Sequence, residues 1–273
     1  MGISSVWREE VMYRAQQNPA IRAHYRKMRS NQTVDYVTRM KKKYLTFSRP
    51  MTIREALESL HTLVDATDPE LQLTNLQHML QSAEGARLSG QPDWMQVVAL
   101  IHDLGKVMYL WGCDEDGTSV NAQWGIVGEV FVVGCRLPDT CIFPEFNVLN
   151  PDMQDPRYNT ETGMYEPQCG LENLQLTWGH DEYLYQVLKN HPGNRLPEIA
   201  MVSIRYHSFY PWHSGGAYGH LENMKDKIYK QWVRYFNQFD LYTPPHRPLN
   251  LSELYDYYHP LIERYLGSEP IYW

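Results

Sequence analysis

The sequence predicts an all-α fold with long ordered loops. In the stretch from Trp94 to Leu104, apolar residues recur at the spacing of a buried helical stripe. Thr52 is followed three residues later by Glu55, which is the capping box that opens a helix ahead of an apolar run. The short apolar runs of residues 126–133 are punctuated by glycines, so they leave room for at most a small β-hairpin.

Length and charge narrow the class of protein. A chain of 273 residues with 43% hydrophobic residues can bury a complete core, and no linker divides it. The net charge of -7 argues against nucleic acid as a partner, since nucleic-acid binding relies on a basic surface. The longest apolar run, residues 97–101, falls far short of the roughly 18 residues of a membrane span. The N-terminus lacks the apolar region of a signal peptide, and the four cysteines form no CxxC pair. We therefore expect a cytoplasmic protein with reduced thiols and no membrane partner.

The first part of the chain reads as helical scaffold. Residues 6–43 are expected to be helical, and the helix that Thr52 opens should stop in the acidic turn at residues 65–69. From the residues alone, Asp65 in this turn is expected to serve turn formation. The next helix carries His78 among Leu76, Met79 and Leu80. A lone histidine on such a face is usually a hydrogen-bonded core residue. His78 becomes a candidate ligand only because the next helix presents His102 and Asp103.

That following helix carries the strongest chemical pattern in the chain. Asp93 is the expected N-cap, and the last turn presents His102 and Asp103, whose burial without a partner would be costly. Adjacent helical residues point about 100° apart, so the pair can offer one imidazole ligand and one carboxylate that bridges sideways. The pattern therefore indicates a two-metal site. Gly105 removes side-chain bulk beside it, and Lys106 supplies a flexible cation.

The second half of the chain supplies further ligand types. Residues 138–170 should form an ordered irregular loop, anchored by aromatic residues and methionines. His180 and Asp181 stand together at a helix start, and the residues alone do not decide which of them turns inward. His207 continues an apolar period and should face inward, whereas His213 is expected to be exposed beyond Pro211.

A helix near residues 232–241 places Asp240 beside Phe239, where a carboxylate needs a cation. The C-terminal helix is expected to be broken by Pro260. The inward-facing ligand types are then His78, His102, Asp103, His180, His207 and Asp240. Imidazoles and carboxylates without thiolates suit iron, manganese, cobalt, nickel or zinc better than magnesium or calcium.

Longer motifs bring in a family resemblance. HDLGK is shared by the broad HD-domain superfamily of metal-dependent phosphohydrolases. The strings PDMQDPRYNTETGMYEPQCGL, WGHDEYLYQV, IRYHSFYPWHS and FNQFDLYT resemble myo-inositol oxygenase, from about Gln32 to the C-terminus. The resemblance implies one HD-domain-type helical bundle over residues 31–273, preceded by a variable N-terminal segment, residues 1–30. It also implies a monomeric enzyme that uses O2 to cleave the ring of myo-inositol to D-glucuronate.

The resemblance also assigns roles to individual residues. It implies two iron ions, active as a mixed-valent Fe(II)/Fe(III) pair. His78, His102 and Asp240 would hold one iron, His180 and His207 would hold the other, and Asp103 would bridge them. This assignment makes His180 the ligand of its pair and leaves Asp181 as a supporting or capping group. Lys106 and Asp103 would be the catalytic side chains. The implied substrate contacts are Asp65, Lys106, Gly128, His207 and Ser208.

Two other interpretations and two departures from the family remain open. An HD phosphohydrolase would use the same ligands but would need a basic pocket, for which only Lys106 and, less directly, Arg205 are candidates. A sugar-binding module without activity is suggested by the 20 Tyr and 8 Trp, and its binding would survive chelation. The chain has no clear counterpart of an N-terminal arginine that covers the site in animal enzymes, and its loop at residues 114–123 is longer. A polyol other than myo-inositol could therefore be preferred.

Overall fold

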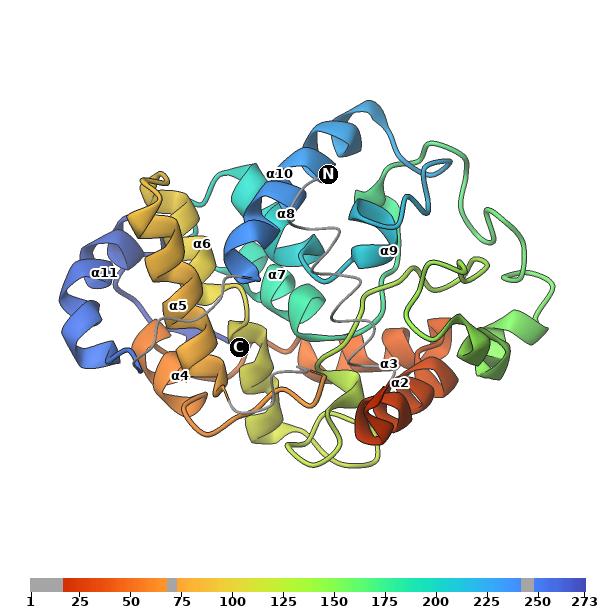
Figure 1. Ribbon diagram of the computed structural model, residues 1–273, viewed down its shortest axis with the longest axis horizontal. Helices are drawn as coiled ribbons and strands as arrows, with labels where there is room; N and C mark the ends of the chain where they lie inside the picture. The colour runs from red at the N-terminus through yellow and green to blue at the C-terminus, as the bar shows by residue number, and fades with distance from the viewer. Residues whose placement is uncertain (1–16, 68–72, 242–247) are drawn as a thin grey trace.

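The computed structural model describes residues 17–67, 73–241 and 248–273, and these form an assembly of α-helices (Figure 1). The prediction of an all-α fold is confirmed. Its helices in these ranges are α2 (Pro19–Asn31), α3 (Val34–Tyr44), α4 (Ile53–Ser59), α5 (Asn75–Leu88), α6 (Asp93–Ile101), α7 (His180–Asn190), α8 (Glu198–Tyr206), α9 (Tyr210–His213), α10 (Met224–Asp240) and α11 (Leu251–Leu266). Short 3₁₀ segments occupy Leu104–Trp111, Gln123–Gly125, Pro144–Leu149, Pro151–Gln154 and Leu171–Asn173. The part of the predicted N-terminal helix before residue 17 lies outside the described residues.

The one sheet in the described ranges is not a hairpin. Strand β1 (Pro50–Met51) pairs antiparallel with β2 (Ile271–Tyr272), so it joins two segments that are far apart in the sequence. The carbonyl of Trp273 also accepts hydrogen bonds from the backbone N–H groups of Ser48 and Arg49. The runs at residues 126–133, where the sequence allowed a hairpin, form turns and a single bridge between Val132 and Leu176. The C-terminus is thereby fixed beside the start of α4.

Three helix predictions need correction. Helix α4 ends at Ser59, before the acidic turn at residues 65–69 where the sequence placed its end, because the N–H groups of Leu60 and His61 bond only three residues back and the chain turns. The N-cap of α6 is Pro92, whose carbonyl accepts from Met95 and Gln96, while Asp93 is the first helical residue and forms an ion pair with Arg264. Helix α11 also runs unbroken through Pro260. Proline removes one N–H donor from a helix, but Pro260 and the residue four positions earlier are exposed, so water can satisfy the carbonyl that loses its donor. The predicted capping box of Thr52 and Glu55 is present.

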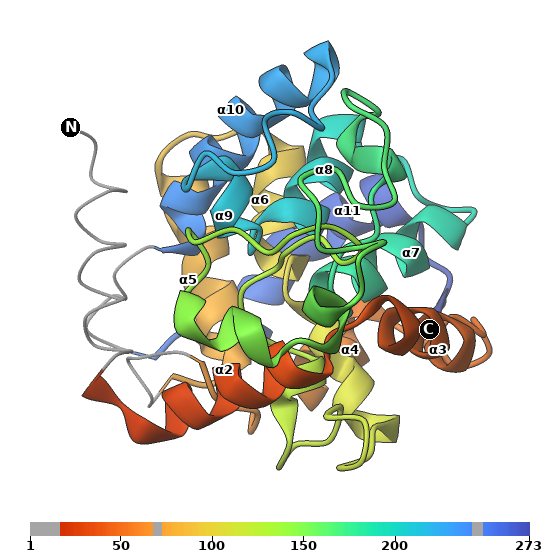
Figure 2. The ribbon, with the colours of Figure 1, turned by 90° about the vertical axis from the view of Figure 1, so that its right-hand side faces the viewer.

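The long loop is ordered by helix α2. Figure 2 shows α2 running beside the segment at residues 144–154. The guanidinium of Arg29, which is buried, donates to Asn147 Oδ1 at 2.7 Å and to the carbonyl of Ile142 at 3.0 Å. Phe143 and Phe146 are buried as predicted anchors, whereas Met164 is 45% exposed. Helix α2 crosses residue 30, where the sequence placed the start of the main domain, and its buried residues belong to the main core.

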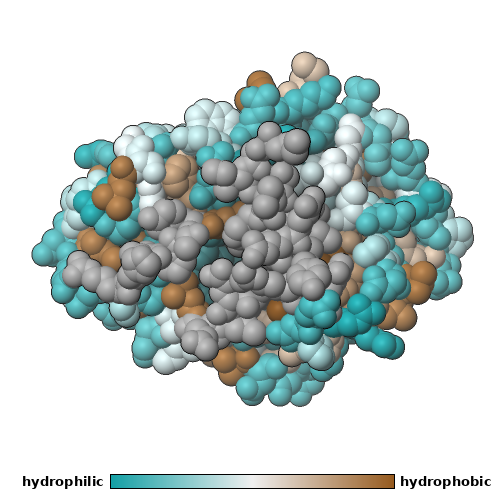
Figure 3. Space-filling model, in the orientation of Figure 1, coloured by the Kyte–Doolittle hydropathy of each residue, from teal (hydrophilic) through white to brown (hydrophobic). Residues whose placement is uncertain are grey.

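One face of the molecule is mainly hydrophilic among its described residues. On the face drawn in Figure 3, hydrophilic side chains predominate among the described residues and the apolar ones are scattered. Exposed apolar side chains such as Leu88 and Met224 stand on separate helices. Among the helices of the described ranges, none has the length and apolar character needed to cross a bilayer. All four cysteines are free thiols, as the sequence predicts.

A buried ion pair joins the neighbouring helices α7 and α8. Arg205 Nε donates to Glu182 Oε2 at 2.7 Å, and the two side chains are 6% and 1% exposed. Burial alone would raise the pKa of Glu182, but the charges of Arg205 and Lys41 hold it below its ordinary value of 4.5. The ionised form is therefore the one that stabilises the fold. Because α7 begins with His180 and α8 ends just before His207, this pair also fixes the spacing of two candidate ligands.

Replacing Glu182 should destabilise the fold in a pH-dependent way. Glu182→Gln leaves Arg205 buried without its counter-charge, which costs about 3–5 kcal/mol when a buried pair is broken. The difference in unfolding free energy between wild type and variant should be complete above pH 4.5 and shrink as pH falls through the lowered pKa. Urea unfolding at several pH values measures it. Glu58→Gln is the matched control, because the Arg54–Glu58 pair on α4 is half exposed and should matter little. Equal effects of the two substitutions would contradict this account.

Candidate metal centre

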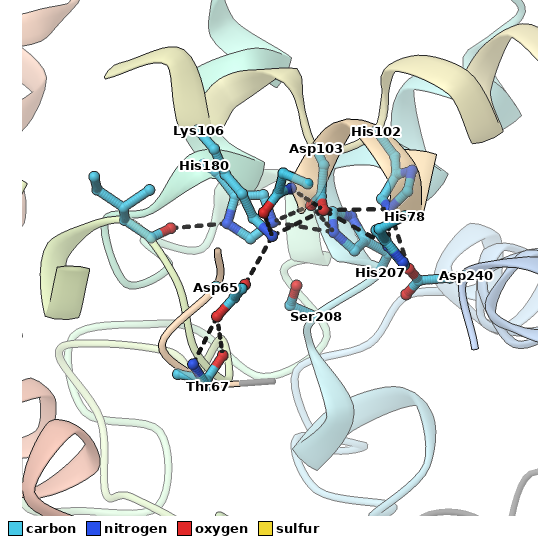
Figure 4. A network of polar contacts seen from close by, with 12 residues as sticks. Asp65, Thr67, His78, His102, Asp103, Lys106, His180, His207, Ser208 and Asp240 are labelled. Carbon is cyan, nitrogen blue, oxygen red and sulfur yellow. Dashed lines mark hydrogen bonds and ion pairs between the residues drawn. The ribbon is translucent and has the colours of Figure 1, made fainter. Parts of the chain in front are cut away.

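Six side chains from the ends of five helical segments converge on one buried point. His78 lies on α5, His102 and Asp103 follow the end of α6, His180 begins α7, His207 follows the end of α8, and Asp240 ends α10. Figure 4 shows the four imidazoles and two carboxylates turned toward one another. His102, Asp103, His180 and His207 are each at most 3% exposed. All six predicted ligand residues are therefore brought together.

The sequence around His102 explains how this segment reaches the centre. The backbone N–H of His102 still bonds to the carbonyl of Val98, so the helical course of α6 continues to this residue. The chain then tightens into the 3₁₀ segment Leu104–Trp111. A β-carbon at Gly105 would lie 2.0 Å from the carbonyl oxygen of His180, so only glycine allows this close approach. The predicted role of Gly105, removal of bulk beside the site, is confirmed by this contact.

The first cluster contains His78, His102 and Asp240. The Nε2 atoms of the two imidazoles are 3.2 Å apart. Each lies 3.0 Å from Asp240 Oδ1. Asp103 Oδ2 completes the group at 3.6 Å from His78 Nε2 and 3.7 Å from His102 Nε2. The first imidazole pair therefore shares two carboxylate oxygens, one from each aspartate.

The second cluster contains His180 and His207, again with their Nε2 atoms 3.2 Å apart. Asp103 Oδ1 lies 3.0 Å from His180 Nε2 and 3.7 Å from His207 Nε2. One oxygen of Asp103 thus faces each imidazole pair. This is the arrangement of a carboxylate that bridges two positions, and it agrees with the geometry predicted for the adjacent His102 and Asp103.

The hydrogen bonds of the outer ring nitrogens test whether cations fit between the pairs. The Nδ1 atoms of His102, His180 and His207 face the backbone carbonyls of Ala99, Ile126 and Ile204 at 2.8–2.9 Å. A carbonyl only accepts, so each Nδ1 carries a proton, and the lone pair of a neutral ring points inward from Nε2. Lone pairs facing each other and a carboxylate oxygen at 3.0–3.2 Å repel unless positive charge lies between them. The donor set and its orientation fit metal ions.

The pKa shifts agree with this need for positive charge. Burial would raise the pKa of Asp103 and Asp240, yet the charge of Lys106 beside the first, and the interactions of the second with the imidazoles of His102 and His78, hold both well below the usual range. Burial lowers the pKa of His102. Burial would also lower the pKa of His207, but the charges of Asp181 and Asp103 raise it to about 9. In the metal-free chain a proton can therefore occupy the second pair, and a metal ion would displace it.

Beside the clusters lies a polar network centred on Lys106. Its ammonium donates to Asp65 Oδ2 at 2.7 Å and to Asp103 Oδ2 at 2.8 Å. Asp65 also accepts from the backbone N–H and the hydroxyl of Thr67 at 2.7 and 2.6 Å. Burial would lower the pKa of Lys106, but Asp103 and Asp65 raise it above its ordinary value. Lys106 is thus a buried ammonium group linked to both the clusters and Asp65, as Figure 4 shows.

Of the two remaining predicted contacts, Ser208 lies beside the clusters and Gly128 lies against helix α2. Gly128 adopts a φ of +121°, a backbone conformation that favours glycine, and a β-carbon there would lie 2.8 Å from Met28 Sδ on α2. Ser208 follows His207, and Figure 4 shows its hydroxyl turned toward the clusters. Its backbone N–H lies 3.4 Å from Asp181 Oδ1.

Sequence reasoning missed several residues of the centre. Asn75 donates to Asp103 Oδ2 at 2.8 Å, and its position one helical turn before His78 is a pattern that could have revealed it. Asn237 donates to the carbonyl of His207 at 3.2 Å and lies 3.4 Å from Asp240 Oδ2. His213 was expected to be exposed, which is wrong, because it is 1% exposed and its Nε2 contacts the carbonyl of His207 at 3.0 Å. The reason is that Pro211 lies within α9, which folds back against the end of α8.

The fold and this centre define an all-helical protein with a histidine and aspartate site suited to metal ions. Comparison with known sequences is more specific. A sequence model of the family described as "Myo-inositol oxygenase" matches residues 18–273. The chain is 47% identical to inositol oxygenase of Mus musculus and 44% identical to that of Homo sapiens, over 88% of this chain and 82% of each relative. Inositol oxygenase of Dictyostelium discoideum is 41% identical over 91% of this chain and 85% of its own length. The chain belongs to the myo-inositol oxygenase family.

Metal removal should lower the thermal stability of the chain. A ligand at 100 times its Kd that binds only the folded state adds about 2.7 kcal/mol, and in a chain of this size that shifts Tm by several degrees. Chelation should therefore lower Tm measurably, and His180→Ala should show a smaller drop. His259→Ala is the control, because this histidine is half exposed on α11. Identical melting curves of the wild type with and without chelator would contradict the metal assignment.

Proposed function

We propose that this protein is an oxygenase that cleaves the ring of myo-inositol with O2 to give D-glucuronate. One C–C bond of the ring is broken in a four-electron oxidation, and one O2 yields glucuronate and water. The proposal is supported by the relatives, whose names state inositol oxygenase activity. The observation that carries it is the pair of imidazole clusters that share Asp103, with the ammonium of Lys106 at 2.8 Å from the same carboxylate.

Two iron ions are the proposed cofactor. His78, His102 and Asp240 would hold one, His180 and His207 would hold the other, and Asp103 would bridge them with one oxygen to each. When bound as a mixed-valent pair, the irons supply O2 activation and the redox chemistry of ring cleavage. Imidazole and carboxylate donors without thiolates are compatible with iron, and their inward-facing Nε2 atoms need a cation.

The other side chains of the site would bind and orient the polyol. Lys106 remains an ammonium because Asp103 and Asp65 raise its pKa, so it can donate to a substrate oxygen and stabilise negative charge there. Asp65 is ionised, since the charge of Lys106 outweighs burial and lowers its pKa, so it can accept from a substrate hydroxyl. The backbone at Gly128 and the hydroxyl of Ser208 are the remaining proposed contacts. Burial of His102, Asp103, His180 and His207 limits the access of bulk water to the reacting centre.

The alternative of an HD phosphohydrolase is less well supported. A phosphoester site is expected to offer a basic pocket beside the metal ions, since Arg and Lys side chains are the usual phosphate-binding groups. Arg205, the second basic candidate near the ligands, is turned to Glu182 in a buried ion pair. Lys106 is then the one cationic side chain that the described contacts place beside the clusters, and its charge is balanced by Asp65 and Asp103. A single ammonium group is not the cluster of cations that a phosphoester site would use.

The context of the enzyme completes the proposal. We propose that it acts as a monomer in the cytoplasm, that residues 31–273 form its oxygenase domain, and that residues 1–30 are variable. The net charge of -7 and the absence of long apolar runs in the sequence support a protein with neither nucleic acid nor membrane as partner.

Oxygen uptake by the iron-loaded protein in the presence of myo-inositol tests this function directly. Uptake should be coupled to formation of one glucuronate per O2, and His207→Ala should abolish both because it removes a ligand of one proposed iron. The exposed-site variant His259→Ala should keep full activity. Phosphoester hydrolysis without inositol-dependent O2 uptake would overturn the proposal in favour of the phosphohydrolase.

Asp65→Asn should weaken substrate binding more than it slows turnover. The loss of a hydrogen bond to a charged group costs about 1.5–3 kcal/mol, which corresponds to a rise in KM of roughly 10- to 100-fold. Steady-state kinetics with myo-inositol measures it, with Asp35→Asn on the exposed face of α3 as control. An unchanged KM for Asp65→Asn would remove Asp65 from the list of substrate contacts.

A further inference from the structure

Asp181 makes contact with both imidazoles of the second cluster. Its carboxylate lies in the first turn of α7, and the residue is 2% exposed. Asp181 Oδ2 is 3.4 Å from His180 Nδ1, and Asp181 Oδ1 is 3.2 Å from His207 Nδ1. We propose that Asp181 is a positioning residue that orients both histidines of one metal position and makes this position bind its ion more tightly. The inference rests on the proposed metal centre but not on the identity of the substrate.

Helix capping does not account for this carboxylate. The N-cap of α7 is Gly179, and no side chain there accepts a capping hydrogen bond. The contacts of Asp181 are instead the two Nδ1 atoms and the backbone N–H of Ser208. All three of these contacts are made with residues of the centre. The position of Asp181 is therefore explained by the histidines rather than by the helix end.

The two metal positions differ in this respect. At the first, the Nδ1 atom of His102 faces the neutral carbonyl of Ala99. At the second position, the Nδ1 atoms of His180 and His207 each face a backbone carbonyl and also the carboxylate of Asp181. A negatively charged acceptor at Nδ1 raises the basicity of the imidazole at Nε2, the atom that would bind the metal. It also fixes the orientation of the ring. The second position should therefore depend on Asp181, and the first should not.

The contacts also predict which of the two histidines loses its orientation when the carboxylate of Asp181 is replaced by an amide. In Asp181→Asn the amide oxygen can keep the contacts of Oδ1 with His207 and Ser208. The amide NH₂ group then replaces Oδ2 and faces the proton on His180 Nδ1, so two donors meet. His180 retains only the carbonyl of Ile126 as acceptor. The substitution should thus disturb the orientation of His180 without changing the size of the side chain.

Metal retention by Asp181→Asn is the test. The full-length chain is loaded anaerobically with Fe(II), titrated with a competing chelator, and assayed for bound iron, with the Mössbauer spectrum recorded at each step. Loss of such a supporting group typically lowers metal affinity by about 10- to 100-fold. We expect one of two equivalents to be released at correspondingly lower chelator concentration, the other to be unchanged, and the spectral change to be confined to one iron. The Tm of the metal-free variant should equal that of the metal-free wild type.

The control is Asp226→Ala. Asp226 is also a buried carboxylate near the start of a helix, but one of its oxygens accepts from the backbone N–H groups of Leu171 and Asn223. Loss of this acceptor should lower Tm with and without metal and leave iron retention unchanged. Wild-type retention of both equivalents in Asp181→Asn would overturn the inference. So would equal weakening of both positions together with a lower Tm of the metal-free variant, because that pattern marks a purely structural residue. If the wild type binds two irons but makes no glucuronate, the proposed substrate fails while this test remains valid.

Discussion

The carboxylate of Asp103 is the contact on which the centre depends. One of its oxygens faces His180 and His207, and the other faces His78, His102, Asn75 and Lys106. A carboxylate that is 3% exposed would be costly without compensating charge, and here every neighbour supplies a donor or a site for a cation. Removing this one side chain would leave two imidazole pairs and an ammonium group without their common partner.

The fold serves this contact by bringing helix ends, rather than helix middles, to one point. A residue at the end of a helix is held by the helix but is free to point along its axis, so five segments can approach one carboxylate without steric conflict. Gly105 permits the closest of these approaches, against the backbone of His180. The buried pair of Glu182 and Arg205 then fixes α7 against α8. Asp181 of α7 contacts both His180, on the same helix, and His207, at the end of α8. The rigidity of the centre therefore comes from charged contacts in its immediate surroundings as well as from the apolar core.

Much of this could be predicted from the sequence because some patterns are local. The capping box at Thr52 depends on residues three positions apart, and the conflict between burial and charge at His102 and Asp103 is visible in one helical turn. The pairing of His180 with His207 is not local, and it was anticipated through the resemblance to a family rather than through spacing. The predictions that proved wrong concern residues whose surroundings depend on tertiary structure. His213 is buried because α9 folds back, and Pro260 is tolerated because its neighbourhood is exposed. The double contact of Asp181 could not be anticipated, since it requires the relative placement of α7 and α8.

The central claim is that the centre holds two metal ions bridged by Asp103, and the distance between these proposed ions tests it most directly. X-ray absorption spectroscopy of the iron-loaded protein should show a metal–metal vector of about 3.5–4 Å, the separation usual in two-metal sites. The same vector should be absent from Asp103→Ala, because among the described residues no other side chain of the centre has one oxygen facing each imidazole pair. A single isolated iron in the wild type, or an unchanged metal–metal vector in Asp103→Ala, would contradict the account.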